Sequence, residues 1–469
     1  MSADRSEVLV MREAILAGER IAPRHFALDE AQWERMVHAR APLWFLAHWC
    51  DAGRAYALFL DGDQPVMAST PMVEGRYLAL SKTVPAAAWS ERMAQDLWDA
   101  RPMFARDVRS LLDMGGWVHS APLSSRRAPG SPPRACCPED EPFGDATGPV
   151  VLTDRDMTFG LSHRGLVQRM LGLSPGEGLR HVGRISSGGF VAHALAYCRA
   201  VEAAIGGSVP PEGRDGRIVL SEIERISVHL DDLARVATLA DAGLLATHAT
   251  LARETIADLC VRHGATRRLT DVIAPEGIAP GIEVRELADA VMELVRTRLP
   301  DWHLLHEGAA FRLRHVGVLE ATRVTSLAIG GLPARATGRS FDLRQREDDP
   351  RYGAGRAGSL TEGDALARGR LRLREIRDSV RRLERVTSDF GVSWEDGRQR
   401  VNVGEGIGAV EGARGDVWCW VRLVDDRIDG FHLRDGAFSL APALGRLVGG
   451  ADAELVLASF GFSAASAAG

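Results

Sequence analysis

The chain has 469 residues, of which 45% are hydrophobic and 26% charged, and its formal net charge at pH 7 is -6. This composition is typical of a globular protein, and the length predicts two or more domains. The acidic balance argues against a nucleic-acid partner, which would need a basic face. Lys82 is the only lysine, so nearly all positive charge is arginine, and we give isolated arginine clusters no binding role.

No stretch of the sequence approaches the roughly 20 consecutive apolar residues that a membrane-spanning helix needs. The N-terminal segment carries charges throughout and lacks the apolar core of a secretory signal. We therefore expect a cytoplasmic protein, which can still dock onto a membrane-embedded partner.

The cysteines show no C-x-x-C spacing, so the sequence supports neither a disulfide framework nor a zinc site, and we expect small apolar side chains in a reducing compartment. They are Cys50, Cys136, Cys137, Cys198, Cys260 and Cys419.

The first part of the chain is predicted to be a small α+β domain spanning residues 1–120. Residues 1–37 have apolar side chains at helical spacings, and short apolar runs that predict strands follow, with a hairpin turn at Asp61-Gly62. A further helix is indicated by Trp89, Met93 and Leu97, which recur at i, i+4 and i+8. Residues 121–148 are dense in Pro, Ser, Gly and charge, which predicts a linker.

Residues 149–469 are predicted to form a mainly α-helical bundle domain with peripheral β segments. Apolar residues recurring every three or four positions predict helices at 190–205, 219–242, 245–263 and 284–299, and one that ends at Val386. Residues 417–434 alternate like a hairpin, and residues 451–469 are predicted to be a strand that trails into small residues. Before the first of these helices, residues 184–189 form a loop of small and polar residues where a cofactor or substrate would be expected.

The order of several motifs in the second part resembles a known family. The motifs are HRG at 163–165, RIxxxxxxxHxLAYxRAVE at 184–202, SEIERIxxHL at 221–230, GLPARATGRSFDLR at 331–344, GDALAR at 363–368, LREIRDS at 373–379 and VEGARGDVWCWV at 410–421. Together they resemble the nickel–iron hydrogenase large subunit and its relative, the D-type subunit of respiratory complex I. Residues 75–109 resemble the C-type subunit of complex I, and fusion of the two is a feature of the energy-converting, formate-hydrogenlyase-type branch. The resemblance implies an α+β protein with a hydrogenase large-subunit-like helical domain.

In that family four cysteines hold a nickel–iron centre, because thiolates are soft ligands that can bridge two metals. On the resemblance, the four ligand positions fall on Ser186, Gly189, Ser463 and Ser466. Neither a serine hydroxyl nor glycine replaces a thiolate, so we expect a vacated metal site, no metal, and no hydrogen activation.

The D-type subunit of complex I lacks these cysteines too, and there the resemblance implies a quinone headgroup site with a histidine on a hairpin and a tyrosine at the helix head. The tyrosine position falls on Ile185, and His163 is a possible stand-in for the histidine against a structural role in its turn. Arg335 and Asp342 match the family's cavity wall together with Arg344. They are candidates for binding an anionic ligand, with salt bridges that pack the loop as the alternative.

Further groups on the predicted core helices have two readings each. His193 and His229 are either cavity-lining groups or hydrogen-bonded interior histidines. Glu222, Glu224 and Arg225 either continue a charged chain toward a membrane partner or form ion pairs.

The resemblance implies a subunit of a membrane-associated oxidoreductase complex of the NADH-quinone oxidoreductase type, in electron transfer to a quinone or other small acceptor. We expect no cofactor on this chain, iron–sulfur clusters in an iron–sulfur small subunit, and antiporter-like membrane subunits as further partners. The chain would lie peripherally on the inner face of the cell membrane, without activity of its own. The alternative is a catalytically inactive scaffold that bridges the soluble and membrane arms.

Overall fold

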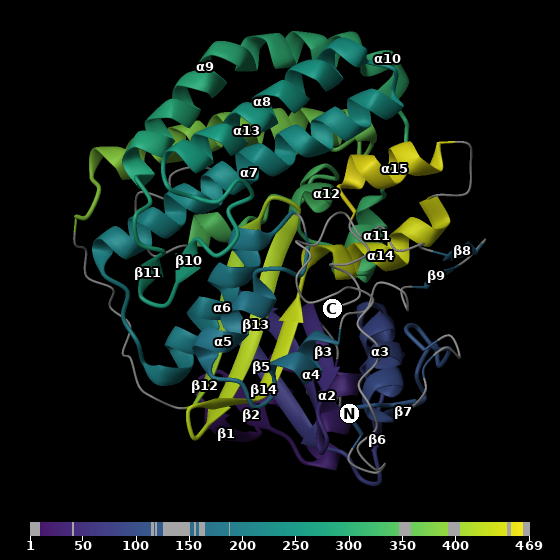
Figure 1. Cartoon of the computed structure of the whole chain (residues 1–469). Helices are drawn as coiled ribbons and strands as arrows, with labels where there is room; N and C mark the ends of the chain where they lie inside the picture. The colour runs from purple at the N-terminus through teal and green to yellow at the C-terminus, as the bar shows by residue number, and fades with distance from the viewer. Residues whose placement is uncertain are drawn as a thin grey trace, which may run out of the picture.

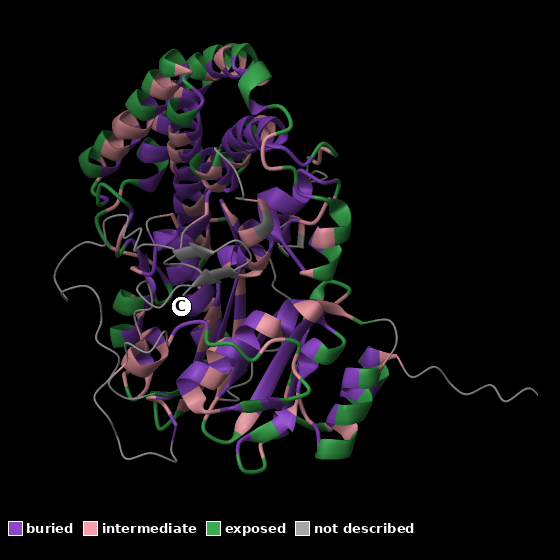
Figure 2. Ribbon diagram, turned by 90° about the vertical axis from the view of Figure 1, so that its right-hand side faces the viewer, coloured by how far each residue is buried: buried purple, intermediate pink, exposed green. Residues whose placement is uncertain are grey.

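The computed structural model places the N-terminal sheet at one end of the molecule and a helical bundle at the other, with a C-terminal sheet between them (Figure 1). Buried residues fill the centre, and exposed ones line the outer helices and the loops (Figure 2). The structure describes residues 10–39, 42–113, 117, 120–124, 151–153, 156–158, 165–186, 188–346, 358–392, 404–447 and 452–462. The predicted α+β class is confirmed.

The N-terminal part is built on a five-stranded sheet with the strand order β1-β2-β5-β4-β3. The strands are β1 (Glu19–Ala22), β2 (His25–Ala27), β3 (Trp44–Cys50), β4 (Arg54–Asp61) and β5 (Gln64–Pro71). β3, β4 and β5 pair antiparallel in chain order, whereas β2 lies parallel to β5. The predicted hairpin turn is confirmed, because Asp61 pairs with Gln64 and Gly62 between them has a φ of 65°.

The prediction of a helical segment over residues 1–37 is wrong in its middle. Helix α1 (Met11–Leu16) stops before the β1–β2 hairpin, and helix α2 (Glu30–His38) starts only after it. Pro23 lies in the turn of this hairpin, and a proline cannot donate a hydrogen bond inside a helix. The hairpin gains further support because His25 pairs with Met67 of β5.

Helix α3 (Ala88–Trp98) packs against β3 and carries the predicted apolar face, with Trp89 and Leu97 buried. The smaller elements of this part are β6 (Arg76–Leu78), β7 (Arg101–Met103) and the 3-10 turns η1 (Leu80–Lys82) and η2 (Pro85–Ala87). Residues 121–124, at the start of the predicted linker, pack on α3, where the Leu123 amide donates to the Leu97 carbonyl. The rest of the linker lies outside the described residues.

The second part begins with the short strands β8 (Val151–Thr153) and β9 (Asp156–Thr158) and continues mainly as helices. The helices are α4 (Leu166–Met170), α5 (Pro175–Val182), α6 (Phe190–Ile205), α7 (Pro211–Leu239), α8 (Gly243–Arg262), α9 (Val284–Gly308), α10 (Ala310–Leu313), α11 (Ala321–Ser326), α12 (Gly331–Arg335) and α13 (Ala365–Ser388). The small strands β10 (Ile273–Ala274) and β11 (Gly277–Ile278) and the 3-10 turn η3 (Leu343–Arg346) lie between these helices.

Helices α7, α8, α9 and α13 lie side by side at the top of the molecule (Figure 1). Their apolar faces share one core with α6, in which Ile226, Val291 and Leu383 are fully buried. The predicted helices 190–205, 219–242, 245–263 and 284–299 are thus confirmed, because long periodic segments carry a strong local signal.

A three-stranded antiparallel sheet covers α6, formed by β12 (Glu405–Gly412), β13 (Gly415–Val424) and β14 (Arg427–Arg434). The predicted hairpin at 417–434 is confirmed as β13–β14. Gly406 and Gly408 allow β12 to touch the helix, since a Cβ at either would lie 2.0 Å from a carbonyl oxygen of α6. No other residue type fits at these two contacts.

The other face of this sheet packs on the N-terminal sheet. Trp49 of β3 stacks on His432 of β14 with ring centroids 4.5 Å apart, and Trp420 of β13 lies 5.2 Å from Tyr56 of β4. At the edge, His25 Nδ1 lies 2.9 Å from a Glu405 carboxylate oxygen. The two parts of the chain therefore share a buried interface that contains several aromatic side chains.

The C-terminal helices α14 (Gly436–Leu447) and α15 (Ala453–Phe460) pack beside α11 and α12 (Figure 1). The strand predicted for residues 451–469 is wrong where the structure describes it, because residues 453–460 are helical. A short apolar run buried on several sides has no periodicity that separates helix from strand. Gly461, with a φ of 64°, ends the helix in the left-handed conformation. Among the described residues, no helix is long and apolar enough to cross a membrane.

Candidate functional site

A stripe of buried polar side chains runs along helix α7. Glu222, Arg225, His229 and Asp232 follow one another at spacings of three and four, so they share one face of the helix. All four are at most 2% exposed. In a helical bundle such positions are ordinarily apolar, and charges buried there require partners.

Helix α13 supplies the partners from a matching stripe. Its members are Arg368, Arg372, Glu375, Ser379 and Arg382, again at spacings of three and four. His229 Nε2 lies 3.0 Å from a Glu375 carboxylate oxygen, and Arg372 donates to Asp232 at 3.2 Å. Ser379 donates to Glu222 at 2.5 Å. The two polar stripes thus face each other across the bundle.

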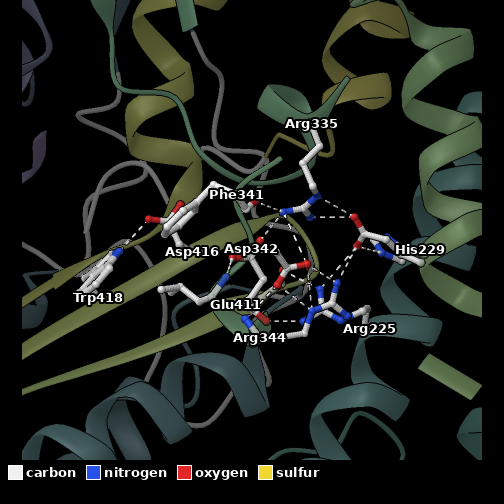
Figure 3. Close-up of polar contacts among 12 residues, drawn as sticks. Arg225, His229, Arg335, Phe341, Asp342, Arg344, Glu411, Asp416 and Trp418 are labelled. Atoms are coloured by element: carbon white, nitrogen blue, oxygen red, sulfur yellow. Dashed lines mark hydrogen bonds and ion pairs between the residues drawn. The ribbon is translucent and has the colours of Figure 1, made fainter. Parts of the chain in front are cut away.

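Arg335, at the end of α12, reaches into this network from one side (Figure 3). Its guanidinium donates to Glu375 from Nε at 3.1 Å and from Nη2 at 2.7 Å. Nη1 donates to Glu411 at 2.8 Å and to the Phe341 carbonyl at 3.2 Å. Arg335 is 1% exposed, so its donors serve the protein itself.

The second arginine pair of the network lies in the segment that follows α12. Arg344 Nη2 donates to Asp342 at 2.6 Å, and its Nη1 lies 3.4 Å from Glu222 (Figure 3). Burial would raise the pKa of Glu222, but the guanidinium groups of Arg344, Arg225 and Arg382 lower it to about 2. In the same way, Arg344 and Arg335 outweigh burial and hold the pKa of Asp342 well below its ordinary value. Both carboxylates are therefore ionised at neutral pH.

Glu411 on β12 behaves differently. Burial, together with the nearby Asp342 and Asp416 carboxylates, raises its pKa to about 7, although the Arg335 guanidinium opposes the shift. Its second carboxylate oxygen accepts the Leu343 backbone N–H at 3.1 Å. Glu411 is therefore a member of the network that can change its charge near neutral pH.

The charges of the network balance when Glu411 is ionised. The carboxylates of Glu222, Asp342, Glu375 and Glu411 face the guanidinium groups of Arg225, Arg335, Arg344 and Arg382. Arg225 also donates to the backbone carbonyls of Glu411 and Gly412, which ties α7 to the sheet. Such a network fixes α7, α12, α13 and β12 relative to one another.

The head of α6 lies beside this network. Ser186 is 3% exposed, and Gly189 is the N-cap residue of α6. Ile185, at the position that the resemblance assigns to a tyrosine, is buried in the same core as Val182. Glu224 accepts the backbone N–H groups of Val191 at 2.7 Å and Ala192 at 3.0 Å, so it caps the helix head. Neither role considered for Glu224 in the sequence analysis, a charged relay toward a membrane partner or an ion pair, describes these contacts.

His193, one turn into α6, is fully buried and lies 2.6 Å from an Asp435 carboxylate oxygen through Nε2. Asp435 also accepts the Ala437 amide at 2.8 Å, which fixes it at the start of α14. These contacts, and those of His229, match the interior hydrogen-bonded reading of both histidines. His163, Ser463 and Ser466 lie outside the described residues.

The residues at the α6 head do not suit a nickel–iron centre. Ser186 offers a hard hydroxyl and Gly189 offers no side chain, and within the described ranges no three His, Cys, Asp or Glu side chains gather in a metal-binding group. The described cysteines lie elsewhere and are buried, and burial raises the pKa of the Cys198 and Cys260 thiols to about 12. These thiols therefore stay protonated and are poor metal ligands.

The sequence reasoning missed several residues that hold this region together. They are Asp232, Arg372, Glu375, Glu411, Arg414 and Asp435. Asp232, Arg372 and Glu375 could have been predicted from the sequence, because they recur at the three- and four-residue spacing of a buried helix face. Charged residues at that spacing indicate a buried ion network. For Glu411, Arg414 and Asp435 no such periodic signal exists.

Comparison with known proteins gives the relationship. The profile of a family described as respiratory-chain NADH dehydrogenase, 49 Kd subunit, matches residues 242–396. The NADH-quinone oxidoreductase C/D subunit of Phocaeicola vulgatus is 27% identical over 291 residues, which cover 59% of this chain and 56% of that protein. The D-type subunit of the same oxidoreductase from Dehalococcoides mccartyi is 27% identical over 294 residues, covering 60% of this chain and 79% of that relative.

Subunit 4 of the NADH-quinone oxidoreductase from Thermus thermophilus is 32% identical over 200 residues, or 40% of this chain and 48% of that relative. The match thus spans little more than half of the C/D relative and about half of the Thermus one. The matched range 242–396 contains the Arg335–Glu375 pair of the network. Over the matched residues, the chain is therefore similar to the D-type subunit of complex I, which in some of these relatives is fused to the C-type subunit.

Proposed function

We propose that this chain is a subunit of a membrane-associated oxidoreductase complex related to complex I and to energy-converting hydrogenases. Within it, electrons from an iron–sulfur partner would pass to a quinone or other small acceptor near the head of α6. The observation that carries this proposal is the sequence similarity, since the matched relatives are named as subunits of an NADH-quinone oxidoreductase.

The finer relation to the nickel–iron hydrogenase large subunit belongs to the same proposal. The order of the motifs from residue 163 to residue 421 supports a large-subunit-like arrangement of the helical domain. Its chemistry would differ, because Ser186 and Gly189 stand where two thiolates would be needed, and Ser463 and Ser466 at the other two positions. We therefore propose a redox subunit without hydrogen activation.

The partners follow from the same relation. An iron–sulfur small subunit would hold the clusters, and antiporter-like membrane subunits would hold the complex on the inner face of the cell membrane. Because the described helices include none that could span a membrane, the chain would attach through those subunits. Genes for both kinds of subunit beside the gene for this chain would support the assignment.

A catalytically inactive scaffold is the second candidate, and a specific observation favours it. Arg335 and Asp342, the proposed cavity-wall residues, bind other side chains of the chain. Ile185 offers no hydroxyl to a quinone headgroup. A scaffold would keep the network for rigidity alone.

Acceptor reduction by the purified complex separates the two candidates. The complex is assayed with a short-chain quinone, carrying either the wild-type chain or its His163→Ala variant, with His248→Ala on the outer bundle as the matched control. The proposed redox role requires lower turnover in His163→Ala, with the subunit composition unchanged. Turnover equal to wild type in both variants would favour the scaffold.

Metal analysis tests the negative part of the proposal. The purified complex is expected to contain iron from its clusters but no nickel bound to this chain. Stoichiometric nickel that stays with the chain after the partners are removed would show that the four ligand positions are assigned wrongly.

A further inference from the structure

The turn between β12 and β13 carries Arg414 to the head of α6. Its Nη2 donates to Asp232 of α7 at 2.8 Å, and the other oxygen of the same carboxylate accepts Arg372 of α13 at 3.2 Å. Asp232 is 1% exposed, and the two guanidinium groups outweigh burial and lower its pKa to about 2. Arg414 is therefore held by a carboxylate that stays ionised.

A glycine in each of two turns packs closely against the Arg414 guanidinium. A Cβ built on Gly188, in the loop before α6, would lie 2.4 Å from Arg414 Nη1. A Cβ on Gly461, in the turn after α15, would lie 2.5 Å from Asp232 Oδ2 and 3.1 Å from Arg414 Nε. Each turn can approach the ion pair this closely only because it has a glycine at the point of contact.

The two turns are neighbours of the four positions assigned to former metal ligands. Gly188 lies between Ser186 and Gly189, and Gly461 directly precedes the segment with Ser463 and Ser466. Four segments far apart in the sequence therefore meet at one ion pair: the α6 head, α7, the β12–β13 turn and the end of α15. In a metal site, bonds from the ligands would join two of these segments.

We infer that Arg414, bound to Asp232 and packed between Gly188 and Gly461, is an ionic cross-link that ties the β12–β13 turn to α7 where the α6 head and the C-terminal turn meet, and that it excludes a metal ion there. A guanidinium is planar and permanently charged, so it can contact both turns while it donates to Asp232. A metal cation beside it would be repelled. The α6 head also resists a cysteine at position 189, because its Cβ would lie 2.8 Å from His193 Cε1.

The cross-link rests on the contacts of Arg414 alone. The further statement, that Arg414 occupies the place of a former metal site, also rests on the proposed function. It requires the relation to hydrogenases, because that relation assigns the four ligand positions. Two experiments on the full-length chain test these statements separately.

The first experiment measures thermal unfolding and chymotrypsin cleavage after Phe460 in Arg414→Gln, in Asp232→Asn and in the double variant. Arg414→Gln is expected to lower the melting temperature and to speed cleavage about tenfold, because the C-terminal turn opens locally. Asp232→Asn is expected to lower the melting temperature further, since it removes the carboxylate that both Arg372 and Arg414 bind. The double variant removes one of these charges and should melt above Asp232→Asn.

The matched control is Arg312→Gln, whose partner Asp241 lies 2.7 Å away in an exposed pair. It is expected to leave both melting and cleavage unchanged. Cleavage after Phe460 that is as slow in Arg414→Gln as in the control would overturn the cross-link.

The second experiment restores the four thiols with Ser186→Cys, Gly189→Cys, Ser463→Cys and Ser466→Cys and titrates the chain with Co²⁺. No thiolate-to-cobalt absorption band is expected while Arg414 is present, and the band should appear when Arg414→Ala is added. A band in the four-cysteine chain that keeps Arg414 would refute the exclusion of metal. If neither chain shows the band, Arg414 is not what excludes the metal ion, and the exclusion is overturned.

Discussion

Glu375 is expected to be the most sensitive position of the buried network. In the substitution Glu375→Gln the shape is kept and the negative charge is lost, so Arg335, which holds this carboxylate at 2.7 Å, loses one of its counter-charges. His229 at 3.0 Å also loses its carboxylate partner. Removing one member of a buried ion pair costs about 3–5 kcal/mol, a large part of the stability of an ordinary domain.

Helix α13 offers a matched control. Glu384→Gln is the same substitution on the same helix, but Glu384 and its partner Arg296 are 44% and 50% exposed at a distance of 2.7 Å. An exposed pair of this kind contributes at most about 1 kcal/mol. The comparison therefore isolates burial from helix propensity and from the chemistry of the substitution.

Urea denaturation followed by circular dichroism measures both variants. We expect the midpoint of Glu375→Gln to fall clearly below that of wild type, and that of Glu384→Gln to stay close to it. If Arg335→Gln is added to Glu375→Gln, part of the loss should be recovered, because neither group is then left unpaired. Equal midpoints for the two single variants would refute the view that the network carries the stability of the bundle.

Three further substitutions test other parts of the structure. Burial raises the pKa of Glu91 from 4.5 to about 7, so the stability it contributes is complete below pH 4.5 and lost as the pH rises through 7. Glu91→Gln should therefore remove a fall of about 3 kcal/mol between pH 5 and pH 8 in urea titrations, and an unchanged fall would contradict this. Gly408→Ala places a methyl group 2.0 Å from the Ala196 carbonyl oxygen of α6 and should lower the melting temperature strongly. The control Gly53→Ala meets nothing within 4 Å and should leave the melting temperature unchanged. Similar melting curves for the two variants would argue against the contact. Trp420→Ala should cost about 3–5 kcal/mol and let the N-terminal sheet unfold before the helices, and a single unchanged transition would speak against the shared interface.

Local patterns predicted the elements whose signals are local. The long helices α6 to α9 and the β13–β14 hairpin repeat their pattern over many residues, so their places were predictable within a few positions, although α7 starts earlier and α9 ends later than expected. The β1–β2 hairpin and α15 were not predictable in this way. The first depends on pairing with Met67, some forty residues away, and the second on burial of a short apolar run.

The candidate site was predictable only in part. Arg335, Asp342 and Arg344 were recognised from the motif that contains them, but their partners were not. The predicted boundaries at 1–120, 121–148 and 149–469 stay predictions, although residues 120–124 already pack on α3 and on the C-terminal helices. His163, Ser463 and Ser466 stay candidates without a described position.

By itself, the sequence determined the α+β class, the order of the long helices and the similarity to the D-type subunit of complex I. These properties depend on periodicity and on motif order, which are written along the chain. Only the tertiary structure decided which charges meet, because the carboxylate that neutralises an arginine can come from any distance along the sequence. Arg344 binds Glu222, which is 122 residues away in the sequence, and Arg414 binds Asp232, which is 182 residues away. A buried charge must be paired wherever its partner lies, so folding settled what the α6 head contains.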